Sequence, residues 1–257
     1  MDRASTSLNK YIARSMETVQ GYLTVQDARL IAALLSYQDQ NNLKGNLCEI
    51  GVHHGRLFLM LALARRAEER ALAIDLFEDD AINTDTQHAG RDRALFANAQ
   101  RLRIQLSDEE ILKTSSLDIH ATDILKRAAG RIRLFSIDGC HLYRHVENDL
   151  RLAQSTLTDE GIIAVDDFFN KDWADASFAT YDFLRRTDSL VPFAITSKLY
   201  LAAPSVAEKY KAALSKCTDL GQIYRVQILG TDVLALRQDA LRKGYEMFRG
   251  LVMRRAS

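Results

Sequence analysis

The segment that decides the fold is Leu134–Phe169, LFSIDGCHLYRHVENDLRLAQSTLTDEGIIAVDDFF. The run Arg131–Ile137, which leads into it, is mostly apolar and β-branched and is typical of a strand. In Tyr143–Leu157 apolar residues recur at intervals of three and four, which predicts a helix. After Gly161, the continuous apolar run Ile162–Val165 is typical of a strand covered on both faces. The segment therefore predicts two parallel strands joined by one helix.

Both predicted strands end in acidic residues, Asp138 after the first strand and Asp166-Asp167 after the second. The carboxyl ends of parallel strands share one edge of the sheet, and ligands of open α/β sheets bind there. Three carboxylates with no evident basic partner would repel one another unless a cation lay among them. Oxygen ligands favour Mg²⁺, Ca²⁺ or Mn²⁺, and the nearby His141 adds weight to a metal site. The alternative is that each aspartate caps the helix that follows it.

The composition excludes several classes of protein. The chain has 257 residues, which predicts one large domain with a sizeable core. Its 34 basic and 34 acidic residues balance, so its charge does not direct it to nucleic acid or to an anionic membrane. Three scattered cysteines suit a reducing compartment, and neither a signal peptide nor an apolar run of about 18 residues is present. We therefore expect a cytoplasmic protein with neither nucleic acid nor membrane as a partner.

A glycine-containing turn follows an earlier predicted strand, in Leu47–Gly55, and leads to the helical pattern Leu57–Ala67. Glycines let the backbone pass close to a ligand, and the start of a helix offers free N–H groups. Gly51 and Gly55 have neither the spacing of the dinucleotide fingerprint nor the Gly-Lys-Ser/Thr of a phosphate loop. Glu49 would repel a phosphate but suits a ligand with an amino group or a sulfonium. Taken alone, this turn could join any strand to any helix.

Two further predicted strands end in polar residues. The strand Ala71–Asp75 ends in an acid about twenty residues beyond the glycine turn, where a carboxylate can bind both hydroxyls of a ribose. The polar segment Asn83–Asp92 suits a mobile lid. A third, weaker strand, Glu110–Thr114, has Ser115-Ser116 at its tip. We therefore expect the tips of these strands to form a cofactor pocket.

Strands that alternate with helices predict an α/β fold with a doubly wound, mostly parallel sheet and right-handed crossovers. We expect seven strands in a single domain, with an N-terminal helical cap at residues 1–45 and a cofactor-binding core at residues 46–203. In the core, Pro192–Thr196 and Lys198–Ala203 are expected to pair as a hairpin. Residues 204–257 form a C-terminal extension whose role is left open, with a candidate hairpin at Val226–Leu236 and an expected helix at Leu241–Val252.

These motifs together resemble the class I S-adenosylmethionine-dependent methyltransferases, which have a Rossmann-like fold. More narrowly, the chain resembles the metal-dependent O-methyltransferases of the macrocin and cephalosporin-biosynthesis type. The first motif is shared by many methyltransferases, whereas the D-G-x-H-x-Y element followed by paired acids is far more specific. The resemblance covers roughly residues 21–203 and rests on Glu49-Ile50-Gly51-Val52-His53-His54-Gly55, Asp75, Asp138-Gly139-Cys140-His141-Leu142-Tyr143 and Asp166-Asp167. The chain departs from the family pattern at two positions. The family often has Glu at the position of Asp166 and commonly has Ser or Thr at the position of Leu57.

The resemblance implies transfer of a methyl group from S-adenosylmethionine to a hydroxyl of a small molecule, such as a sugar, a natural product or another diol. It implies a divalent cation, Mg²⁺, bound by Asp138, Asp166 and Asp167, with His141 as the catalytic base. The implied cofactor-binding residues are Glu49, Gly51, Val52, His53, Gly55, Asp75, Ser115, Ser116 and Asp138. The acceptor and the number of subunits, a homo-oligomer included, are left open.

The acidity of the acceptor gives an independent reason to expect a cation. An ordinary histidine has a pKa of about 6.5 and an alcohol one near 15.7, a gap worth on the order of 12 kcal/mol. A bound divalent cation can supply much of this free energy, whereas for a phenol the gap falls to about 5 kcal/mol.

Two other classes of protein remain as alternatives. An NAD-binding enzyme is disfavoured by the glycine spacing, and an inactive methyltransferase-fold binding module by the intact acids. For His141 the alternative is a local hydrogen bond at the start of a helix.

Overall fold

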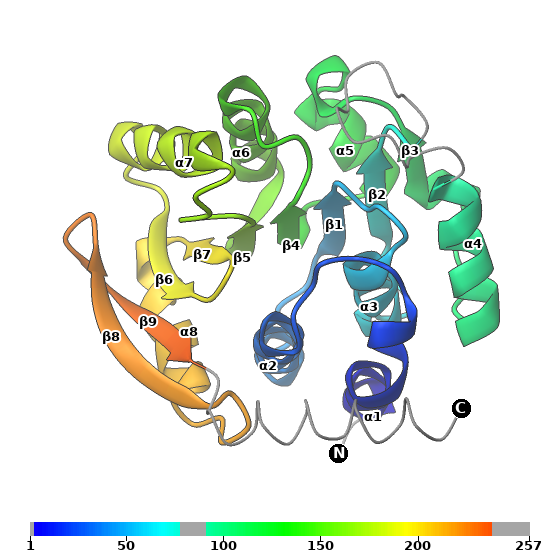
Figure 1. Ribbon diagram of the computed structural model, residues 1–257, viewed down its shortest axis with the longest axis horizontal. Helices are drawn as coiled ribbons and strands as arrows, with labels where there is room; N and C mark the ends of the chain where they lie inside the picture. The colour runs from blue at the N-terminus through cyan, green and yellow to red at the C-terminus, as the bar shows by residue number, and fades with distance from the viewer. Residues whose placement is uncertain (1–2, 78–90, 238–257) are drawn as a thin grey trace.

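The fold is described from a computed structural model, which covers residues 3–77 and 91–237 (Figure 1). All but the end of the expected lid Asn83–Asp92, and the whole expected helix Leu241–Val252, lie outside the described residues. In chain order the helices and strands are α1 Arg3–Lys10, α2 Val25–Gln40, β1 Asn46–Ile50, α3 Arg56–Ala64, β2 Ala71–Asp75, α4 Arg91–Leu102, β3 Ile111–Lys113, α5 Ala121–Ala128, β4 Ile132–Ile137, α6 Tyr143–Thr156, β5 Leu157–Val165, α7 Ala174–Arg186, β6 Val191–Ile195, β7 Leu199–Ala202, α8 Pro204–Leu214, β8 Gln222–Ile228 and β9 Thr231–Arg237.

The strands form one sheet in the order β3-β2-β1-β4-β5-β7-β6-β9-β8. The strands from β3 to β5 are parallel to their neighbours, and β7 pairs antiparallel to β5. The expected doubly wound, mostly parallel sheet is confirmed. The chain starts at β1, winds outward to β3 and then returns to place β4 on the other side of β1. This reversal between β1 and β4 is the position at which open α/β sheets bind ligands.

The expectation of seven strands was wrong, because the described part of the sheet has nine. The candidate hairpin in the C-terminal extension forms as β8 and β9, and β9 pairs parallel to β6 through Ala194↔Leu234. That pairing joins segments far apart in the sequence, and no local pattern in either strand specifies it. The first hairpin, β6–β7, pairs as expected through Ile195↔Leu199.

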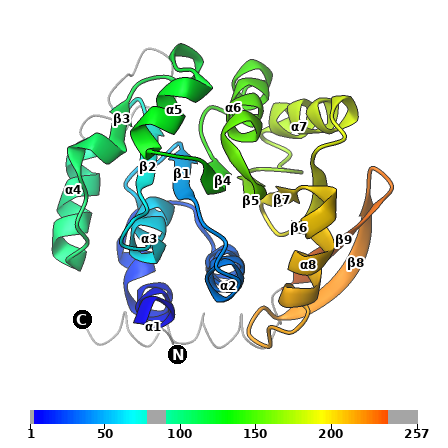
Figure 2. The ribbon, with the colours of Figure 1, turned by 180° about the vertical axis from the view of Figure 1, so that it is seen from behind.

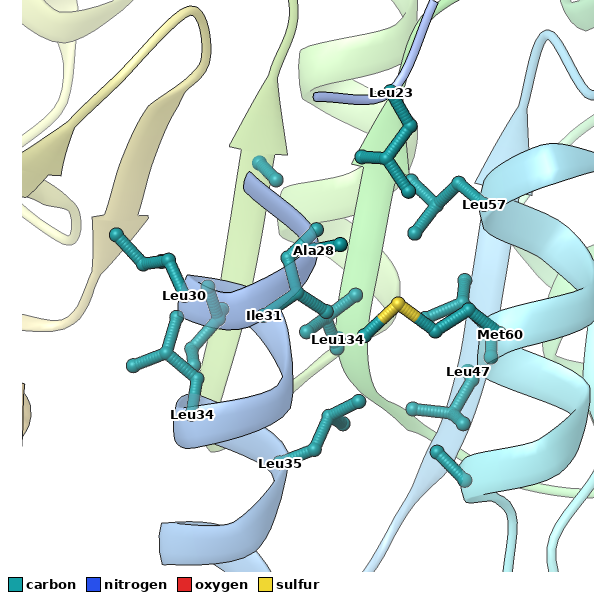
Figure 3. Close-up of a cluster of buried hydrophobic side chains, with 14 of the residues drawn as sticks. Leu23, Ala28, Leu30, Ile31, Leu34, Leu35, Leu47, Leu57, Met60 and Leu134 are labelled. Carbon is teal, nitrogen blue, oxygen red and sulfur yellow. The ribbon is translucent and has the colours of Figure 1, made fainter. Parts of the chain in front are cut away.

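Helices cover both faces of the sheet, as Figures 1 and 2 show from opposite sides. The buried side chains of α2, α3 and α8 belong to one hydrophobic cluster, and those of α5, α6 and α7 to another. Successive strand residues alternate between the clusters: Leu47 and Leu134 face the first, whereas Cys48 and Phe135 face the second. In Figure 3 Leu134 lies between Ile31 of α2 and Met60 of α3, and Leu47 lies below Met60. None of the helices in the described ranges is long and apolar enough to cross a membrane.

Candidate cofactor and active site

The glycine turn after β1 lies against the end of β4. Gly51 has a φ of +84°, and a Cβ built on it would lie 1.9 Å from the backbone oxygen of Asp138. Gly55 has a φ of +89°, and a Cβ there would come within 2.4 Å of the Leu95 side chain. Both positions require glycine for conformation and for space. Gly51 therefore allows the turn to pack closely on the β4 tip, and Gly55 allows it to pack against α4.

Asp75, at the end of β2, holds this turn in place. Its Oδ2 accepts backbone hydrogen bonds from Val52 at 2.6 Å and from His53 at 2.8 Å, and its Oδ1 accepts one from Phe77 at 2.8 Å. The carboxylate thus satisfies N–H groups that precede α3, where a helix start leaves donors unpaired. Asp75 therefore shapes the turn, in addition to the ribose contact that the sequence predicts for it.

A pocket of about 210 Å³ opens at the carboxyl ends of β1, β2 and β4. Eight of the nine predicted cofactor residues line it, and the exception is Gly55, which begins α3 behind the turn. The sequence did not assign a cofactor role to several other lining residues, among them Gly21, Tyr22, Leu23, Arg56, Thr114 and His145. The predicted residues thus come together around one cavity, at the sheet edge where the strand order reverses.

Glu49 carries an unsatisfied carboxyl group into this pocket. It is only 2% exposed, and its Oε2 has no hydrogen-bond partner. Burial, with Asp138 as the next cause, raises the pKa of Glu49 well above its ordinary value. A buried polar oxygen without a partner is costly, so the site favours a ligand that donates to it. The amino group of S-adenosylmethionine fits this requirement.

The predicted cation position between the strand tips contains a lysine. The Lys198 Nζ lies 3.0 Å from Asp138 Oδ2 and 3.0 Å from Asp166 Oδ2, and its side chain is 2% exposed. The premise that these acids have no basic partner was therefore wrong. Among the residues that the structure describes, no group of three or more His, Cys, Asp or Glu could hold a metal ion. As arranged here, the side chains do not fit the expected three-carboxylate metal site.

The two carboxylates and the ammonium group shift one another's pKa values. Burial lowers the pKa of Lys198, but Asp138 and Asp166 outweigh it and raise that pKa above its ordinary value. Burial and the neighbouring Asp166 raise the pKa of Asp138 well above its usual range. For Asp166 burial acts upward, yet the charge of Lys198 brings its pKa below the ordinary value. The two carboxylates thus favour the charged form of Lys198, which lies at the same distance from both.

Asp167, the third predicted metal ligand, contacts His141. Its Oδ2 lies 2.9 Å from His141 Nε2, whereas Asp138 Oδ1 is 3.9 Å from the same nitrogen. The imidazole also stacks on Trp173, with 4.9 Å between ring centroids and 30° between planes. A carboxylate on one side and an indole on the other fix the orientation of the ring, which lines the pocket. The contact with Asp167 is a close approach of the two side chains and not a hydrogen bond, because the buried Nε2 has no hydrogen-bond partner.

Comparison with known proteins agrees with this geometry. Residues 48–168 match a family model described as a methyltransferase domain. No curated protein matches the chain. Among solved structures, the O-methyltransferase NovP matches with a TM-score of 0.54 and 16% identity, covering 78% of this chain and 99% of that one. An O-methyltransferase from Bacillus cereus in complex with SAH has a TM-score of 0.51 and 12% identity, over 79% and 91%.

CalS11, a TDP-rhamnose 3'-O-methyltransferase of calicheamicin biosynthesis, matches with a TM-score of 0.50 and 16% identity, over 77% of this chain and 92% of that one. At these identities the likenesses concern the fold. The chain therefore shares the fold of these O-methyltransferases, and residues 48–168 match the methyltransferase-domain model.

Proposed function

We propose that this protein transfers a methyl group from S-adenosylmethionine to a hydroxyl of a small-molecule acceptor. The observation that carries the proposal is the juxtaposition, in one pocket, of the unsatisfied Glu49 carboxyl and the His141 imidazole, which lies beside the Asp167 carboxylate. The first feature suits the cationic end of the cofactor and the second suits removal of a proton from the acceptor. NovP and CalS11, both O-methyltransferases, support a hydroxyl as the acceptor group.

In this proposal the residues around the glycine turn bind the cofactor. Glu49 accepts from its amino group, and Asp75 holds the turn while its carboxylate faces the ribose. Ser115 and Ser116, at the tip of β3, line the pocket and contribute polar groups on the same side as Asp75. When bound, S-adenosylmethionine supplies an electrophilic methyl group on a sulfonium. The chain's own task is to hold that methyl group in line with the acceptor oxygen.

His141 is the proposed base. Its ring lines the pocket, with Nε2 2.9 Å from the Asp167 carboxylate, and it is the group proposed to take the hydroxyl proton. As the ring gains that proton, the Asp167 charge stabilises the imidazolium, the role of the carboxylate in an acid-oriented histidine. The expected divalent cation has no step in this proposal, because Lys198 lies between two of its three expected ligands.

Calorimetric titration with S-adenosylhomocysteine, compared with NAD, tests the cofactor assignment directly. We expect binding of the first and none of the second, and the reverse result would favour the dinucleotide alternative. A catalytically inactive binding module would also bind S-adenosylhomocysteine. It is distinguished by incubating the protein with methyl-labelled cofactor and a panel of phenols, sugars and other diols, where an inactive module transfers no label.

A further inference from the structure

We propose that Lys198 is the resident cation of this site, so that the acidic cluster takes up no divalent metal ion and methyl transfer proceeds without one. The inference about turnover rests on the proposed function, whereas the inference about metal binding does not. It concerns the space between Asp138 and Asp166, where the ammonium nitrogen lies 3.0 Å from a carboxylate oxygen of each.

The geometry places the ammonium group and a metal ion in competition for the same carboxylate oxygens. A magnesium ion needs oxygen ligands at about 2.0–2.1 Å in a nearly octahedral arrangement. The oxygens that face one another at this position already contact the Lys198 ammonium, and the third acid, Asp167, contacts His141. A metal ion shared by the two strand tips would therefore have to displace the ammonium group or lie beside it, positive charge against positive charge.

The ammonium group is held in position by the backbone on which it stands. Lys198 belongs to the turn that joins β6 to β7, and in the sheet Leu199 pairs with Val165, the residue before Asp166. Within the turn, the Thr196 backbone N–H donates to the Lys198 carbonyl oxygen at 2.9 Å. The register of β7 on β5 thus places the lysine opposite the acid.

A buried acid from α2 secures this turn on both sides of the lysine. Asp27 is 1% exposed and accepts hydrogen bonds from the Ser197 hydroxyl at 2.7 Å and from the Tyr200 hydroxyl at 3.2 Å. It also accepts one from the Thr196 hydroxyl. Residues before and after Lys198 are thereby fixed to α2. The structure supplies its own cation, and Asp27 of α2 holds the turn that carries it.

The proposal is tested by Mn²⁺ binding, measured by electron paramagnetic resonance, without any substrate or cofactor. The wild-type protein is expected to leave Mn²⁺ free, and Lys198→Ala is expected to bind one ion that is lost again in Lys198→Ala/Asp166→Asn. Lys211→Ala is a matched control, because Lys211 is also buried but pairs with Glu208 on α8. It is expected to behave as the wild type. Lys198→Gln, closer in length, serves if the alanine variant does not fold.

Stoichiometric Mn²⁺ binding by the wild type, abolished by Asp166→Asn, would overturn the proposal, and this arm depends on no lysine variant. A folded Lys198→Ala or Lys198→Gln protein that binds no Mn²⁺ would overturn it as well, since removal of the internal cation should open the site. These outcomes are independent of methyl transfer. Transfer that stops on chelation, in a protein that binds Mn²⁺, would contradict the role of Lys198 and leave the proposed function standing.

Discussion

His141 Nε2 lies 2.9 Å from Asp167 Oδ2, although the two residues follow different strands, β4 and β5. The parallel pairing of these strands, with Ile137 beside Val165, brings the imidazole and the carboxylate to one edge of the sheet. Since Trp173 covers one face of the ring, the imidazole has a defined orientation before any ligand binds. A base held in this way loses little freedom when it takes a proton, which is how positioned groups lower a barrier.

The first prediction concerns that base. His141→Ala should lower kcat by roughly 10²–10⁴-fold, the usual contribution of a general base. Affinity for S-adenosylhomocysteine should stay close to wild type, because the imidazole is assigned to the acceptor. Steady-state kinetics and calorimetry on the same preparation measure both effects. The control is His120→Ala, an exposed histidine at the start of α5. Equal kcat values for His141→Ala and wild type would remove His141 from the mechanism.

The second prediction concerns Glu49. Because its Oε2 is buried without a partner and burial raises its pKa, Glu49→Gln should leave the thermal stability of the free protein unchanged or higher. The same change removes an acceptor for the cofactor amino group and should weaken binding by about 1.5–3 kcal/mol, roughly ten- to a hundredfold. Calorimetry with S-adenosylhomocysteine and a melting curve test the two halves. A variant with lower stability and full affinity would contradict the assignment.

The third prediction concerns Asp75, which holds the glycine turn. Asp75→Ala removes the acceptor of two backbone hydrogen bonds in the glycine turn. Cofactor affinity should fall by about 1.5–3 kcal/mol, roughly ten- to a hundredfold. An exposed acid at a distance from the turn, Asp172→Ala, is the matched control and should bind as the wild type does. If calorimetry finds the same affinity for Asp75→Ala, the acid at the end of β2 has no part in binding.

The fourth prediction is a dependence of stability on pH. Asp149 on α6 is fully buried with one oxygen unpaired, and burial raises its pKa to about 6. Because folding raises the pKa of Asp149, the stability that its protonated form gives is fully present below the pKa of the unfolded chain. That stability is lost as the pH rises through about 6. Asp149→Asn imitates the protonated form. It should exceed wild type in the free energy of unfolding by up to about 2–3 kcal/mol at pH 8 and converge with it below about pH 4.

Urea denaturation at both pH values measures this difference. Asp172→Asn, an exposed acid, controls for the loss of one negative charge and should show no such convergence. A difference between Asp149→Asn and wild type that is the same at pH 4 and pH 8 would show that the carboxyl does not titrate as described.

Local patterns were sufficient for the centre of the molecule. The periodicity of Leu134–Phe169 predicted β4, α6 and β5 and the edge at which their acids meet, because a parallel β–α–β unit leaves little choice of arrangement. The positions of the glycine turn and of Asp75 followed in the same way, because the turn follows β1 and Asp75 ends β2, and both strands belong to the parallel part of the sheet. Eight predicted residues therefore line one pocket, although their contacts with the cofactor stay predictions.

The parts that the sequence did not reveal depend on pairing over a long distance. Lys198 reaches Asp138 and Asp166 only because β7 inserts antiparallel beside β5, and one lysine in a predicted hairpin carries no sign of that register. The join of β9 to β6 is of the same kind. In the sequence the acids have no evident basic partner, and the expectation of a divalent cation rested on that.

The most direct test of the account is transfer of a labelled methyl group from S-adenosylmethionine to a panel of hydroxyl acceptors, before and after exhaustive chelation. We predict label in at least one acceptor, at an unchanged rate after chelation. Phenols are expected to react faster than aliphatic diols, because deprotonation by a histidine alone costs about 5 rather than about 12 kcal/mol. Absence of label from every acceptor, with the cofactor bound, would contradict the proposed function. Loss of all transfer on chelation, restored by Mg²⁺, would contradict the role of Lys198.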